Sequence, residues 1–104
     1  MSARVELVPD RDHCIETVAR SEYRRCVSRC LGAPGEPDPE LAGRLEVLRR
    51  FLEEAPFPRL RAEADRALRA GLAVRFEVWL AGDRVAYRMV TGMPEGPDPA
   101  GPGA

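Results

Sequence analysis

Two cysteines stand four residues apart, at Cys26 and Cys30, in a stretch with helical periodicity. On a helix this spacing places both sulfur atoms on one side, where two thiolates could supply half of a tetrahedral metal site. The third cysteine, Cys14, would lie roughly 18 Å from Cys26 along such a helix, so one chain could not complete the site with it. Both positions also fall on the apolar stripe of the helix, and free cysteine is among the most buried residue types. The sequence therefore favours packing in the core, with a metal or redox site completed by a second copy as the alternative.

Acid–base chemistry has little support in the sequence. His13 is the only histidine, and it points away from Cys26 and Cys30 on a helical wheel, which favours an exposed residue in the first turn. The adjacent carboxylates Glu53 and Glu54 would point about 100° apart on a helix, so they are poorly placed to share a proton. Nucleotide-binding, zinc-hydrolase and calcium-loop patterns are also missing. We therefore predict that the protein is not an enzyme and has neither catalytic residues nor a cofactor.

The composition sets the class of protein. A chain of 104 residues with 44% apolar and 32% charged residues is typical of one globular domain. Its net charge of -1 argues against strong generic binding to nucleic acid or to anionic membranes. The sequence has neither the long apolar run of a membrane span nor a secretory signal. With three cysteines, an odd number, we expect a cytoplasmic protein with reduced thiols.

The sequence around the cysteines predicts a first helix from about Asp10 to Leu31. Asp10 or Asp12 can cap its start, and Gly32 can end it because glycine adopts the left-handed conformation without steric cost. Apolar residues recur there every three or four positions, which indicates one buried stripe. They are Ile15, Ala19, Tyr23, Cys26 and Cys30.

Two further helices follow a Gly/Pro-rich connection at Leu31 to Pro39. The first of them is expected to begin at Pro39 after the N-cap Asp38, and the second runs from Pro58 to Ala70, where Gly71 ends it. The predicted apolar faces are Leu41, Leu45, Leu48, Phe51 and Leu52 in one helix, and Leu60, Ala64, Ala67 and Leu68 in the other. Opposite charges four residues apart predict a solvated outer side. These pairs are Glu40 with Arg44, Glu46 with Arg50, and Arg49 with Glu53.

The stretch from Leu72 to Val90 alternates apolar and other residues, which predicts a β-hairpin. A two-residue turn at Gly82 and Asp83 fixes the register. One face then pairs Leu80 with Val85, Val78 with Tyr87 and Phe76 with Met89, and the other pairs Trp79 with Ala86 and Glu77 with Arg88. The opposite-charge pair and the large-to-small pair support this register.

Together the elements predict an α+β fold. Three helices are expected to pack on one face of a small, mainly antiparallel sheet, made of the hairpin and a short N-terminal strand at Val5 to Val8. Residues 1–91 would form this single domain. Residues 92–104 are rich in Gly and Pro, and we expect a disordered tail there.

Trp79 is the residue most suited to binding a partner. In the predicted register it leaves the sheet opposite Phe76, beside Arg75 and Arg88, and Trp and Arg are enriched at the energetic centres of protein interfaces. We therefore expect a protein-interaction or self-association module, with a second copy or another protein as partner. Alternatively, a helix or the N-terminal strand covers the indole, or the ring lies flat against Ala86.

A nucleic-acid-binding function is the main alternative. Three helices followed by a hairpin resemble the order of elements in a winged helix, with Pro58 to Ala70 as the recognition helix. Arg59, Arg66 and Arg69 would lie on its outer side. The turn is short for a wing, however, and Glu63 and Asp65 interrupt the basic surface. Nucleic acid is therefore the less favoured partner, and solvated ion pairs are the simpler explanation of these arginines.

Overall fold

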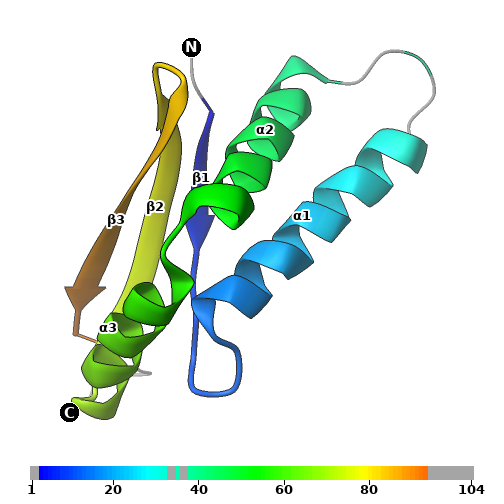
Figure 1. The fold of residues 1–104 in the computed structure, drawn as a ribbon. Coiled ribbons are helices and arrows are strands. Elements are labelled where there is room, and N and C mark those ends of the chain that lie inside the picture. Colours follow the sequence, from blue (N-terminus) through cyan, green and yellow to red (C-terminus); the bar gives the residue numbers. More distant parts are fainter. Residues whose placement is uncertain (1–2, 33–34, 36–37, 94–104) are drawn as a thin grey trace.

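The computed structural model describes residues 3–32, 35 and 38–93. Within them the chain forms a strand, three helices and two further strands (Figure 1). In chain order they are β1 (Arg4–Leu7), α1 (Ile15–Gly32), α2 (Pro39–Glu54), α3 (Phe57–Arg69), β2 (Ala73–Ala81) and β3 (Arg84–Gly92).

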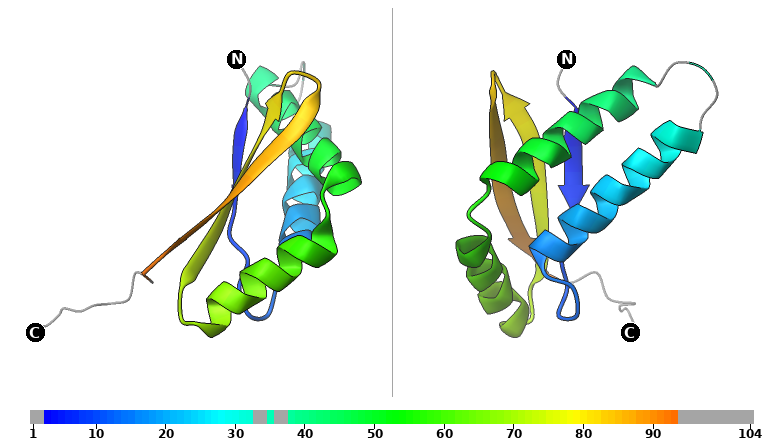
Figure 2. Two further views of the ribbon diagram at one scale, coloured as in Figure 1. Left: turned by 60° about the vertical axis from the view of Figure 1, so that its left-hand side comes forward. Right: turned by 45° about the vertical axis from the view of Figure 1, so that its right-hand side comes forward.

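The strands form one antiparallel sheet in the order β1-β2-β3. Figure 2 shows α1, α2 and α3 on one side of this sheet. The predicted α+β architecture, with helices on one face of a small antiparallel sheet, is therefore confirmed.

The predicted hairpin has the expected turn and register. Trp79 lies opposite Ala86, and Glu77 lies opposite Arg88. Gly82 has a φ of 68°, a left-handed conformation that glycine adopts without steric cost. The strand β3 continues past Val90 to Gly92, the first residue of the predicted tail. Residues 94–104 of that tail lie outside the described residues.

The N-terminal strand joins the sheet through β2. It spans Arg4–Leu7 rather than the predicted Val5 to Val8, and Val8 is exposed beside it. Val5 lies opposite Val78, and Leu7 lies opposite Phe76. Both β1 side chains are buried among the helices, as their alternation predicted.

The predicted start of α1 was wrong. The Oδ1 atom of Asp10 accepts hydrogen bonds from the backbone N–H groups of Asp12 and His13, both at 2.8 Å, so this carboxylate stabilises a turn before the helix. The first helical hydrogen bond runs from the N–H of Val18 to the carbonyl of Cys14 at 3.0 Å. Cys14 therefore takes the capping position that was predicted for Asp10 or Asp12.

The predicted connection between the first two helices is also shorter than expected. Leu31 and Gly32 are the last residues of α1, and Pro39 is the first residue of α2. Asp38 caps α2 as predicted, because its Oδ1 atom accepts a hydrogen bond from the N–H of Glu40 at 3.1 Å. Residues 33–34 and 36–37 of the connection lie outside the described residues.

The core lies between the sheet and the helices, and Phe51 of α2 is at its centre. Its ring meets Phe57 edge-on, with 5.3 Å between ring centroids, and meets Tyr87 of β3 at 5.8 Å. Val47 and Leu48 are buried beside it, whereas the predicted Leu41, Leu45 and Leu52 are only half-buried. The buried side of α2 therefore includes Val47, which was not predicted, and lies partly off the predicted stripe of leucines.

The corner before α3 forms where the two prolines predicted it. Ala55 is extended, with φ of -70° and ψ of 140°, and α3 begins at Phe57, one residue before Pro58. After Arg69 the chain turns through Gly71, whose φ is 84°, into β2. This turn places the hairpin directly against the helices.

Candidate functional site

The side of the sheet away from the helices is the candidate site, and we call it the outer face. Side chains alternate between the two sides of a strand, and Val74, Phe76 and Val78 are buried on the helix side of β2. The register then assigns the remaining positions to the outer face. Its main side chains are Arg4, Glu6, Arg75, Glu77, Trp79, Arg84, Ala86, Arg88 and Val90.

Trp79 lies in the middle strand of this face, between Arg4 of β1 and Ala86 of β3. It points away from the core, as the register predicted, and its side chain is half-buried. The guanidinium carbon of Arg4 lies over the indole at 5.2 Å from the ring centroid, which is a cation–π contact. The N-terminal strand therefore covers the indole in part, through Arg4, as one of the predicted alternatives expected.

Glu77 is the second centre of the outer face. Although it lies on the side away from the helices, the residue is only 7% exposed. Its Oε1 atom accepts a hydrogen bond from Arg88 at 2.5 Å, and its Oε2 atom accepts one from Arg75 at 3.1 Å. Arg4 approaches Oε1 at 4.0 Å. The predicted pair with Arg88 is therefore confirmed, within a larger cluster of arginines.

These contacts control the ionisation of Glu77. The hydrogen bond from Arg88 lowers the pKa of the Glu77 carboxyl below its ordinary value, and the bond from Arg75 acts in the same direction. Desolvation of the carboxyl opposes them and is a smaller effect than the hydrogen bond from Arg88, so the net pKa is lowered. Glu77 is thus held in its charged form, and it orients the arginines that were predicted to flank Trp79.

The sequence did not identify Arg4 as part of this face. The alternation within β1 does place Arg4 and Glu6 on one side of the strand. It does not tell which strand lies beside β1, so it could not bring Arg4 next to Trp79. Arg75 also approaches Glu6 with 3.4 Å between Nε and Oε2. The outer face can therefore offer a half-buried indole and several guanidinium groups already held by carboxylates.

The cysteines are not gathered into a site. Cys26 is buried in the core, Cys14 and Cys30 are half-buried, and all three are free thiols. In the parts of the chain that the structure describes, no three His, Cys, Asp or Glu side chains are grouped as metal ligands. His13 is exposed and lies before α1 rather than in its first turn, with its Nδ1 atom 3.1 Å from Asp10.

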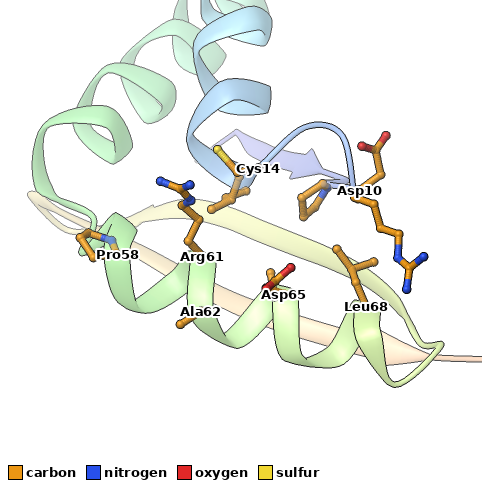
Figure 3. A pocket seen from close by; sticks show the side chains of 11 residues that line it. Asp10, Cys14, Pro58, Arg61, Ala62, Asp65 and Leu68 are labelled. Carbon is orange, nitrogen blue, oxygen red and sulfur yellow. The ribbon is translucent and has the colours of Figure 1, made fainter.

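A cleft of about 450 Å³ separates the start of α1 from α3 (Figure 3). Cys14, just before α1, and Arg61 of α3 line it, and Asp65 and Leu68 continue its wall. The Cys14 Sγ atom lies 3.3 Å from the hydroxyl of Thr17, and this contact is the main cause that lowers the pKa of the thiol. Sequence reasoning missed this cleft because it depends on how α3 packs against the turn at Asp10.

The arginines of the nucleic-acid alternative are exposed on α3. Arg59 approaches Glu63 at 4.0 Å, and Arg69 pairs with Asp65 at 3.0 Å. Arg59 also donates a hydrogen bond to the hydroxyl of Tyr87 at 3.3 Å. The same acidic residues that interrupt the basic surface in the sequence therefore neutralise two of its three arginines.

Comparison with known proteins places the chain in a family. No curated protein and no solved structure matches the chain. In the described residues, none of the helices is long and apolar enough to cross a bilayer. A family model matches residues 1–85, which include Arg4, Arg75, Glu77 and Trp79 of the outer face. This match covers most of the sequence, so the chain belongs to that family, which is an uncharacterised one.

Proposed function

We propose that the protein is a non-enzymatic interaction module of the cytoplasm that binds another protein through the outer face. The observation that carries this proposal is the half-buried Trp79 on a side of the sheet where α1, α2 and α3 do not pack. Trp and Arg are both enriched at the energetic centres of protein interfaces.

The contacts around Glu77 support a binding role for the face. Arg75 and Arg88 are held by hydrogen bonds to one carboxylate, so their side chains lose less conformational freedom when a partner binds. Arg4 is held against the indole by the cation–π contact. Such preorganisation favours affinity because part of the entropic cost of ordering these side chains is met in the free protein.

The charge of the face favours an acidic partner over a second copy. Arg4, Arg75, Arg84 and Arg88 outnumber the carboxylates Glu6 and Glu77 on this side of the sheet. Two such faces placed against each other would bring like charges together. We therefore infer that the outer face binds a protein segment that carries acidic residues around an apolar group.

The experiment compares Trp79→Ala with Leu31→Ala. Leu31 is 83% exposed at the end of α1 and lies outside the outer face, so its loss is a matched control for removing an apolar side chain. Tagged parent and variants are used to capture proteins from a lysate of the native cells, and thermal unfolding shows that each variant is folded. We expect the parent and Leu31→Ala to capture the same partner and Trp79→Ala to bind it at least about 30-fold more weakly.

The chain contains one tryptophan, so its fluorescence reports on this face alone. Adding the captured partner should move the emission maximum to shorter wavelength as the indole leaves water. Equal capture by the parent and by Trp79→Ala would contradict the proposal, and so would the recovery of no partner by the parent.

A further inference from the structure

The strand β3 is a long edge of the sheet. It has nine residues, and within the described residues only β2 pairs with it. Its register with β2 runs without a bulge from Arg84 to Gly92, and it contains no proline. The opposite edge, β1, has four residues and is followed by Pro9. Bulges, prolines and short length are the usual devices that prevent strand addition, so β3 is the less protected edge.

The hairpin turn determines which backbone groups of β3 are free. Ala81 and Arg84 flank a two-residue turn, so they exchange both of their backbone hydrogen bonds. The pattern then alternates, and every second residue of β3 points its N–H and C=O groups away from β2. These residues are Val85, Tyr87, Met89 and Thr91.

The side chains along this edge are also incompletely covered. Val85, Tyr87 and Met89 pack against the core but remain half-buried, whereas Phe76 and Val78, their neighbours on β2, are fully buried. A hollow of about 600 Å³ lies beside Val85 and Tyr87, between the hairpin and the end of α2. The apolar core therefore extends to β3, and its side chains there remain partly exposed to solvent.

We propose that a second copy of the chain pairs with β3 in antiparallel orientation, with Tyr87 on the two-fold axis, and forms one continuous sheet. This inference goes beyond the proposed function, since it concerns the edge of the sheet and a different partner. Strand addition of this kind pairs the free backbone groups of both copies. In a two-fold arrangement each contact occurs twice.

The register follows from charge and from the apolar side chains. When the pairing is centred on Tyr87, Val85 lies opposite Met89 of the second copy. The side chain of that Met89 can then enter the hollow beside Val85 and Tyr87. On the outer face it opposes Arg88 to Ala86 and Arg84 to Val90. A pairing centred on Arg88 would place two guanidinium groups directly opposite each other, and one centred on Ala86 would oppose Arg84 to Arg88, both of which are unfavourable.

A charge exchange tests this register. Val90→Arg would oppose two arginines across each end of the paired strands, and we expect the dissociation constant to rise by about 2- to 30-fold. Adding Arg84→Glu to Val90→Arg should lower the dissociation constant again, because the guanidinium introduced in one copy then faces the carboxylate introduced in the other. Within one chain these two positions lie about 20 Å apart along the strand, so rescue cannot arise inside a single copy.

The measurement is sedimentation equilibrium over a range of protein concentrations, with Arg84→Glu alone as control and thermal unfolding as a check of the fold. A parent that stays monomeric would overturn the inference, and so would a double variant that associates no better than Val90→Arg. Trp79→Ala is included in the series, and we expect it to associate like the parent. If Trp79→Ala were the only variant to lose self-association, the proposal that β3 pairs with a second copy would fail. The proposed binding of another protein by the outer face is judged separately, by capture.

Discussion

Glu77 shows how a carboxylate can be buried on the outer face of a small sheet. A buried charge is costly unless it is paired and hydrogen-bonded, and here Arg88 and Arg75 provide both. The lowered pKa of Glu77 has a direct consequence for stability. Its charged form is favoured by folding, so its stabilising contribution is present above the ordinary glutamate pKa and is lost as the pH falls through the lower value of the folded protein.

We expect Glu77→Gln to lower the melting temperature at pH 7, and the difference from the parent to shrink as the pH falls below about 4.3. Thermal unfolding between pH 7 and pH 3 measures both effects. Glu6→Gln is the matched control, because Glu6 lies on the same face but its side chain is 59% exposed. A gap between Glu77→Gln and the parent that stays constant down to pH 3 would show that the Glu77 carboxylate is not linked to folding.

Single contacts were predictable where the residues are close in sequence or opposed in the hairpin. The pair of Glu77 with Arg88 and the outward direction of Trp79 both followed from alternation. The expected pair of Glu40 with Arg44 is replaced, since Arg44 of α2 instead contacts Glu22 of α1 at 3.1 Å. A contact between helices depends on how they pack, and neither spacing nor propensity contains that information.

Among the elements, those bounded by glycine and proline were predicted best. Asp38, the corner at Pro56 and the turn at Gly82 each impose a local backbone conformation, so their positions follow from the sequence. The start of α1 could not be placed in this way. Asp10 and Asp12 are both good capping residues, and the use of Asp10 in an earlier turn depends on the packing of the chain between β1 and α1.

The hairpin turn allows a test at this scale. We expect Gly82→Ala to lower the free energy of unfolding by about 1–2 kcal/mol, because Gly82 has a φ of 68° and a Cβ atom disfavours that conformation. Gly32→Ala is the control. Gly32 is helical and has open space around it, so this change should be neutral or stabilise the protein by up to about 1 kcal/mol. Urea unfolding measures both, and equal effects of the two substitutions would contradict this account of the turn.

At the scale of the whole molecule, the class of fold was predictable but the order of the strands was not. Alternation assigns each side chain of β1 to one of two faces, yet it does not say which edge of the hairpin receives the strand. Pairing with β2 makes Arg4 the neighbour of Trp79 and brings Arg4 and Glu6 to the outer face. The composition of the candidate site thus depends on a long-range pairing that local patterns do not determine.

The balance of charge over the molecule predicts weak interaction with nucleic acid. The net charge is -1, and Arg59 and Arg69 of α3 are paired with carboxylates of the same helix. We expect no mobility shift with random duplex DNA or RNA, even at low salt, where such binding is strongest. Binding that weakens steeply with salt and is reduced by Arg66→Ala would instead support the winged-helix alternative.

The pairing of β1 with β2 also orders events during synthesis. Residues 4–7 are made before their partners at residues 76–79, which follow only after α1, α2 and α3. Until the ribosome has released the hairpin, the helices have no sheet to cover and Val5 and Leu7 have no strand beside them. Closing so long a loop is slow relative to forming a helix, so we expect the helices to form before the sheet and to expose their apolar faces until residues 73–92 have been made.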